Sequence, residues 1–219
     1  SSLKTNMRKI PILSALLFLF MNNFLTANPN SIYSANSIPA ELKKNAHTVI
    51  RYEKTTFEVT NIHKAEIRYK AIITILDKKS PYSDIVVFYD KAFDKAELKN
   101  IKIYNANGKV IRKIKNKNVS DHSSYSREMF DEGRYKYADG SHSEYPYTVE
   151  YEYSKTTTMT MFYPDWYIVR NFEISVEKSD FELITPIDIK VRYKSNNIDL
   201  PIKESVEGSQ RFYKMSANN

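Results

Sequence analysis

The chain has 219 residues, of which 42% are hydrophobic and 27% charged, a balance typical of a soluble globular protein. Its formal charge is +7, but acids are interleaved with the basic residues rather than kept apart from a basic arm, which argues against nucleic acid as a partner. Cysteine is absent, which excludes disulfides, a cysteine nucleophile and the lipid-anchoring cysteine of bacterial exported proteins.

The first residues have the pattern of a secretory signal peptide. A basic start at Met7–Lys9 precedes an apolar run over 10–20 and a small-residue cleavage site that ends at Ala27. The run is about half the roughly 20 residues that span a bilayer. The sequence therefore predicts that residues 1–27 are upstream sequence and a cleaved leader, that the protein is periplasmic or secreted, and that no stable membrane span is left. An uncleaved anchor is the alternative, because apolar residues just beyond the run could extend it.

Residues 28–46 are expected to form a flexible lead-in, since they begin with an Asn- and Ser-rich stretch that has no periodicity. Pro39, followed by residues 40–46, predicts a short helix with proline in its first turn. The globular domain is expected over 47–219.

After residue 46 the hydrophobic period becomes two, which predicts β-strands. The clearest alternation runs over 65–75. The stretch 48–60 alternates as well, but its phase changes between Tyr52 and Phe57, which a bulge would explain. The apolar run 85–89 indicates a central strand.

A hairpin is predicted around Asn105–Gly108, because asparagine and glycine readily adopt turn conformations. The last third alternates again, over 145–153, 166–176 and 187–193, and residues 211–213 are expected to close the sheet. Strands at short intervals without helical patterns between them predict an all-β fold, an antiparallel two-sheet β-sandwich that is immunoglobulin-like or related.

Between residues 119 and 144 the periodicity lapses, and a long irregular loop is expected there. Weak metal-ligand candidates in this loop are Asp121, His122, Asp139 and His142. They allow a metal-dependent or carboxylate-based hydrolase as an alternative function. No His-x-x-x-His pair or EF-hand ladder accompanies them, so a solvated loop is the main expectation, and no cofactor is predicted.

Aromatic residues supply the candidates for ligand binding. They are Tyr135, Tyr137, Tyr163, Trp166 and Tyr167. Such rings give a large contact area at a small entropic cost, which suits a carbohydrate or peptide platform. An alternating tyrosine ladder is more often packing between strands. No Gly-x-Ser-x-Gly elbow is present, and Glu150 and Glu152 are interpreted as a solvent-facing strip of a sheet.

Three stretches carry a family resemblance: 144–153 (EYPYTVEYEY), 162–167 (FYPDWY) and 174–181 (ISVEKSDF), followed by Pro186. They resemble domain of unknown function 3857 over roughly 46–215. The resemblance implies a β-sandwich that lies N-terminal to a transglutaminase-like core in exported proteins of bacteria with two membranes, with no established activity. Such a core brings its own Cys, His and Asp, and none of these can be placed on this cysteine-free chain.

The combined expectation is an exported, non-catalytic binding or accessory domain with a protein or glycan partner. A structural module of a cell-envelope assembly is the other alternative to the hydrolase. The ligand and the oligomeric state are not predicted.

Overall fold

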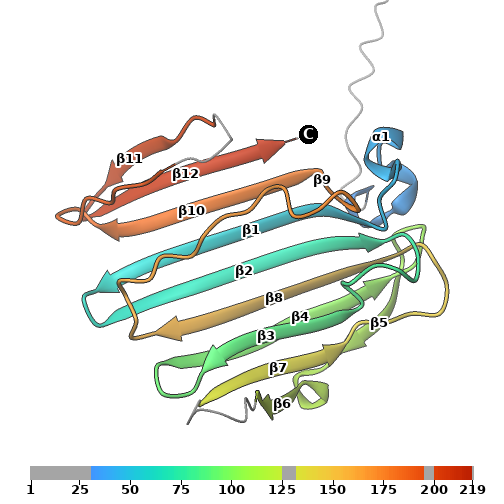
Figure 1. Cartoon of the computed structure of the whole chain (residues 1–219), viewed down its shortest axis with the longest axis horizontal. Helices are drawn as coiled ribbons and strands as arrows, with labels where there is room; N and C mark the ends of the chain where they lie inside the picture. The colour runs from blue at the N-terminus through green and yellow to red at the C-terminus, as the bar shows by residue number, and fades with distance from the viewer. Residues whose placement is uncertain (1–30, 125–131, 195–199, 219) are drawn as a thin grey trace, which may run out of the picture.

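The structure, a computed structural model, describes residues 31–124, 132–194 and 200–218 and consists mainly of two β-sheets (Figure 1). The strands are β1 (Thr48–Asn61), β2 (Lys64–Ile75), β3 (Asp84–Asp90), β4 (Asp94–Tyr104), β5 (Val110–Ile114), β6 (Ser120–Ser123), β7 (Gly133–Asp139), β8 (Tyr147–Thr157), β9 (Ile174–Val176), β10 (Lys178–Pro186), β11 (Lys203–Glu207) and β12 (Gln210–Asn218). The helices are α1 (Ala40–Lys43) and the single 3₁₀ turns Ser31–Tyr33, Ala35–Ser37 and Asn116–Asn118.

The large sheet has nine strands in the order β11-β12-β10-β1-β2-β8-β4-β5, with β9 also paired to β1, and the small sheet has the order β3-β7-β6. The predicted all-β class with two sheets is confirmed. The predicted antiparallel pairing is wrong for β1, which runs parallel to both β9 and β10. The unequal size of the sheets also departs from an immunoglobulin-like arrangement.

The parallel pairing follows from the connection between β8 and β10. Residues 158–173, here called the crossover segment, leave the end of β8 and pass over the face of the large sheet before β9 begins (Figure 1). A crossover of a dozen or more residues is what two parallel strands in one sheet require. A hydrophobic period of two is the same for parallel and antiparallel strands, so the sequence pattern did not reveal it.

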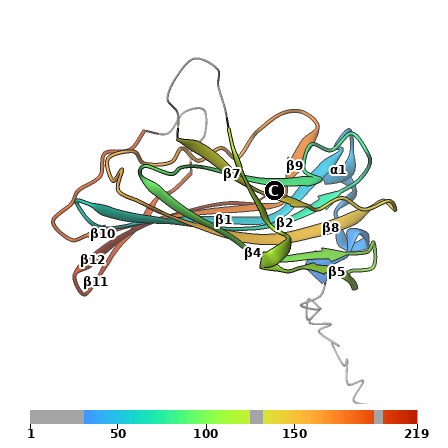
Figure 2. The same cartoon turned by 90° about the horizontal axis from the view of Figure 1, so that it is seen from below.

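The small sheet and the crossover segment cover the same face of the large sheet, here called the inner face (Figures 1 and 2). One core lies between the small sheet and β2, β4 and β8; its buried members are Ile75, Ile85, Val87, Leu98, Ile101, Ile103, Ala138, Tyr147 and Val149. A second core lies under the crossover segment; its buried members are Phe57, Val59, Ala65, Phe181, Leu183 and Tyr213.

Several predicted strands are confirmed. The alternation over 65–75 is β2, the run over 145–153 lies largely in β8, and the closing residues 211–213 lie in β12. The predicted hairpin joins β4 to β5, with Gly108 at a φ of 79° and its amide donating to the Asn105 carbonyl.

The run 85–89 is β3, an edge strand of the small sheet rather than a central strand. It buries Ile85 and Val87 and exposes Val86 and Phe88. Only the side of β3 that faces the large sheet is buried, because no described residues form a further layer on the other side of the small sheet.

One expected loop contains strands, and two expected strands are largely irregular. The loop expected over 119–144 contains β6 and β7. The strand expected over 166–176 is irregular until β9 begins at Ile174, because the preceding residues pass over the inner face instead of lying in the sheet (Figure 1). Residues 187–193, expected to form a strand, are irregular, and the nearest strand, β10, ends just before them at Pro186.

The lead-in expected to be flexible is packed where it is described. Ala35, Ile38 and Leu42 are buried against Val49, and the short helix predicted after Pro39 is confirmed as α1. The predicted leader, residues 1–27, lies outside the described residues. Within the described part, no helix has the length and apolar character to cross a membrane.

Candidate functional site

A pocket of about 350 Å³ opens on the inner face, where the crossover segment passes over β1. Its lining combines aromatic rings, an aliphatic side chain and three charged groups, and consists of Glu53, Thr55, Asp165, Trp166, Tyr167, Val169 and Arg170. Two of the five aromatic residues suggested by the sequence, Trp166 and Tyr167, therefore line one pocket.

Glu53 is on the inner face because of a bulge in β1. Ile50 pairs with Ile73 and Glu53 with Ala71, so one extra residue, Arg51, shifts the phase of the strand. The predicted bulge is confirmed, although it lies just before the stretch in which the phase change was expected. Without the extra residue, Glu53 would face the opposite side of the sheet.

Residue Glu53 is 2% exposed, and its carboxylate accepts three hydrogen bonds. Tyr69 donates its hydroxyl to Oε2 at 2.8 Å, Ser179 donates to Oε1 at 2.8 Å, and the Arg170 guanidinium donates to Oε2 at 2.5 Å. A buried carboxylate is stable in a fold only when it is paired and hydrogen-bonded in this way.

Arg170 fixes the crossover segment to β1 and to the connection between β2 and β3. Besides the bond to Glu53, its Nη1 donates to the Tyr82 hydroxyl at 2.8 Å. Burial acts to lower the pKa of Arg170, but the charge of Glu53 and the neighbouring tyrosines outweigh it and raise the pKa. Arg170 therefore stays charged, and both of its terminal nitrogens are engaged.

Tyrosines form a layer beneath this pair. The ring centroid of Tyr69 lies 5.1 Å from that of Tyr153 and 5.9 Å from that of Tyr151. Burial raises the pKa of the Tyr69 phenol well above its usual value, with Tyr151 and Glu53 adding to the effect. The alternating tyrosines of β8 are thus packing residues, which is the more common role of tyrosines that alternate along a strand.

Trp166 is tied to the same network. Its Nε1 donates to Ser179 Oγ at 2.8 Å, and its ring lies 6.1 Å from that of Phe181. The neighbouring Tyr167 is 64% exposed and donates its hydroxyl to Asp165 at 3.1 Å. Tyr163 does not line the pocket; its ring contacts that of Phe57 edge to face at 5.2 Å.

Large apolar side chains project from the crossover segment into solvent. Phe172 is fully exposed and Met161 is 83% exposed, and Phe162 and Val169 are also largely exposed. Met161 and Phe162 precede the pocket residues in the sequence and Phe172 follows them, while Trp166 and Arg170 hold the middle of the segment in place.

The remaining two aromatic candidates lie apart, on the small sheet. Tyr135 and Tyr137 of β7 alternate with buried Ala138, on the face that Phe88 and His122 share. The Tyr135 ring is 5.7 Å from Phe88 and 5.2 Å from His122. This row of rings is a second, flat aromatic surface.

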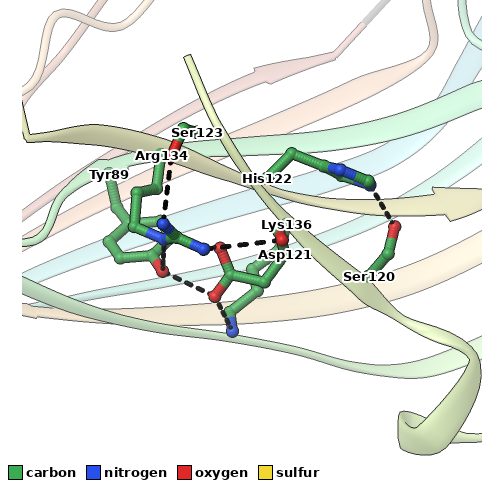
Figure 3. A network of polar contacts seen from close by, with 7 residues as sticks. All are labelled: Tyr89, Ser120, Asp121, His122, Ser123, Arg134 and Lys136. Atoms are coloured by element: carbon green, nitrogen blue, oxygen red, sulfur yellow. Dashed lines mark hydrogen bonds and ion pairs between the residues drawn. The ribbon is translucent and has the colours of Figure 1, made fainter. Parts of the chain in front are cut away.

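Asp121 and His122, two of the weak metal candidates, point to opposite faces of β6. Figure 3 shows Asp121 held between Arg134 and Lys136 and His122 directed away from it, toward Ser120. The Asp121 carboxylate lies 2.9 Å from Arg134 Nε and 2.6 Å from Lys136 Nζ. Its charge is therefore already compensated by two cations.

The other two metal candidates, Asp139 and His142, also make contacts within the chain. Asp139 accepts the backbone amide of Ser141 at 2.8 Å, and the His142 ring packs edge to face on Tyr147. Over residues 31–124, 132–194 and 200–218, no three His, Cys, Asp or Glu side chains come together as metal ligands would.

Asp121 should make the fold sensitive to acid. Burial acts to raise its pKa, but Lys136, Tyr89 and Arg134 outweigh it and lower the pKa to about 2. An unfolded aspartate titrates near about 4, so the stabilisation by Asp121 is complete above about pH 4 and is lost as the pH falls toward about 2. Urea unfolding of wild type and Asp121→Asn should show a difference at about pH 5 that vanishes near about pH 2. A difference that stays constant over this range would contradict the assignment.

The interpretation of Glu150 as a solvent-facing residue is wrong. It was expected on a solvent-facing strip, yet it is buried on the outer face of the large sheet. The Tyr104 hydroxyl donates to it at 2.6 Å, and Lys102 and Lys70 lie within 3.2 Å. Burial acts to raise its pKa, but these donors lower it.

The charged pair of the pocket, Glu53 and Arg170, was missed by the sequence reasoning. Arg170 interrupts an otherwise apolar alternation, which was a usable signal. Glu53 has no such signal, because only the position of the bulge places it on the inner face.

The fold and the pocket define a two-sheet β domain that presents a crossover segment and a charged, aromatic-lined cavity. Residues 61–219 match the family model described as a domain of unknown function with solved structures, DUF3857, and the chain belongs to this family. The match begins at the last residue of β1, so Glu53 lies before it. No curated protein matches the chain in sequence.

The fold is similar to that of a solved structure. A crystal structure described as a putative protease from Parabacteroides distasonis superposes with a TM-score of 0.66 at 11% identity, over 79% of this chain and 35% of its own. The chain thus spans about a third of that protein's length, and the likeness concerns the fold alone. An M1 zinc metallopeptidase from Deinococcus radiodurans gives a TM-score of 0.34 at 7% identity, over 78% of this chain and 39% of its own.

Proposed function

We propose that the chain is a non-catalytic accessory domain that binds another protein through the crossover segment. The observation that carries this proposal is the exposure of Met161, Phe162, Val169 and Phe172 on one segment. Several large apolar side chains exposed on one segment suit an interaction site, and methionine and aromatic side chains are enriched in protein interfaces.

The anchoring of the segment supports binding. Trp166 bonds to Ser179 and Arg170 to Glu53, so the backbone that carries the apolar side chains is held against the sheet before a partner arrives. A surface that is ordered in advance loses less conformational entropy on association.

The contacts of Glu53 and Asp121 support binding over hydrolysis. Glu53 already accepts three donors, one of them cationic, and it is therefore poorly placed to take a proton from water. The metal-dependent alternative would use Asp121, whose carboxylate is compensated by Arg134 and Lys136.

Site-specific crosslinking tests the proposal. A photo-crosslinking phenylalanine derivative at position 172 should form a saturable adduct with one protein in an extract of the source cells, and the same derivative at position 111 of β5 should not. Ile111 is a matched control, since it is also apolar and exposed but lies on an edge strand of the large sheet.

The captured protein, once purified, should bind wild type and Ile111→Gln equally. It should bind Phe172→Gln at least about tenfold more weakly, because burying a phenylalanine contributes about 1.5–3 kcal/mol. The proposal fails if both positions give the same adduct, if neither does, or if Phe172→Gln binds as tightly as wild type. Binding of a glycan that depends on Phe88 and Tyr135 instead would assign the function to the small sheet.

A further inference from the structure

We propose that the pocket beside Trp166 takes a basic side chain, lysine or arginine, of the protein partner. This assignment rests on the proposed function, because the pocket lies in the middle of the segment that would form the interface. Its volume of about 350 Å³ is at the small end of ligand pockets, which suits one side chain rather than a larger cofactor.

The charges of the lining favour a cation. Glu53 and Asp165 face a single cation, Arg170, so one negative charge is in excess (2 − 1 = 1). Glu53 and Arg170 are bonded to each other, which leaves Asp165 as the carboxylate that a ligand can use. Among the described residues, Asp165 has one hydrogen bond, from the Tyr167 hydroxyl, and no ion pair.

An anionic ligand fits this lining less well. It would have to bind Arg170, whose Nη2 is held by Glu53 at 2.5 Å and whose Nη1 is held by Tyr82 at 2.8 Å. Withdrawing Arg170 would leave Glu53 buried without its cation, which is a costly change. A cation reaches Asp165 without disturbing that pair.

The aromatic lining supports the same choice. Trp166 and Tyr167 flank Asp165 in sequence and share the pocket with it. Cations bind the faces of such rings, and tryptophan is the strongest of them. An ammonium or guanidinium group in this pocket would meet a carboxylate and two rings, and its aliphatic stem would lie near Val169.

Trp166 gives a direct test, because it is the only tryptophan of the chain. The full chain is titrated with short acetylated, amidated peptides that carry a central arginine or lysine, and Trp166 emission is recorded. Matched peptides carry citrulline, which keeps the shape of arginine without its charge, or glutamate. The basic peptides should give a saturable change with a Kd on the order of 1 mM or tighter, and the other two should give none.

Asp165→Asn should weaken the basic peptides about tenfold or more, the loss expected for a charge-assisted hydrogen bond. Asp165 is exposed, so this variant should fold normally, and its melting curve checks this. The control is Glu207→Gln on β11, which also removes one exposed acid and should leave binding unchanged.

Three results would overturn the assignment: citrulline binds as well as arginine, glutamate is the peptide that binds, or Asp165→Asn has no effect. If no peptide changes Trp166 emission at about 10 mM while Phe172→Gln still loses the crosslinked partner, the pocket assignment fails and the proposed interface stands. If the basic peptides bind but no partner depends on Phe172, the interface fails and the pocket remains a cation site.

Discussion

Replacing Arg170 with methionine should lower the free energy of unfolding by about 3 kcal/mol. The reason is Glu53, which is 3% exposed as a side chain and would keep a buried negative charge with two neutral donors. Breaking a fully buried ion pair costs about 3–5 kcal/mol, and the lower end applies because the Arg170 side chain is 27% exposed. Urea unfolding followed by circular dichroism measures the change.

A double-mutant cycle separates the ion pair from lost packing. Glu53→Gln with Arg170→Met should lose less stability than the two single changes added together, with a coupling of about 0.5–3 kcal/mol. Lys178→Met is the control, since the Lys178 side chain is 47% exposed and its 3.7 Å pair with Asp180 should contribute about 1 kcal/mol or less. Additive losses for Glu53 and Arg170, or a loss for Arg170→Met no larger than for Lys178→Met, would mean that the pair does not hold the crossover segment.

The sequence predicts a strand well where one face of the strand is buried and the other faces solvent. In β2, the inner face is apolar and the outer face carries Glu66, Arg68 and Lys70, so the alternation is clear. It fails over 166–173, which form no strand: Trp166 lines the pocket, and Phe172 lies on the proposed interface. Phe172 illustrates this, because it continues the alternation yet is fully exposed.

The pocket was predictable only in part, because its members come from segments far apart in the chain. Trp166 and Tyr167 are neighbours in an aromatic cluster, so composition alone indicated them. Glu53 meets Arg170 only after the crossover has brought the segment over β1. The phase change predicted a bulge but not its position at Arg51, and the crossover has no local signal, so the sequence did not place these side chains.

Phe57→Ala should be the most damaging change in the second core, with a loss of about 3–5 kcal/mol. The Phe57 side chain is fully buried on β1, and its ring supports that of Tyr163 in the crossover segment. Its removal opens a cavity beneath the segment, so amide exchange over 158–173 should become faster and Trp166 emission should shift in the folded protein.

Ile103→Ala distinguishes a general loss of stability from a local effect. Ile103 is also fully buried, but it belongs to the core under the small sheet. It should cost about 2–5 kcal/mol and leave Trp166 emission and amide exchange over 158–173 as in wild type under native conditions. Equal effects of both variants on the segment would show that it opens only with global unfolding. An effect confined to Phe57→Ala is expected instead, because only that core lies beneath the segment that carries the apolar surface and the pocket.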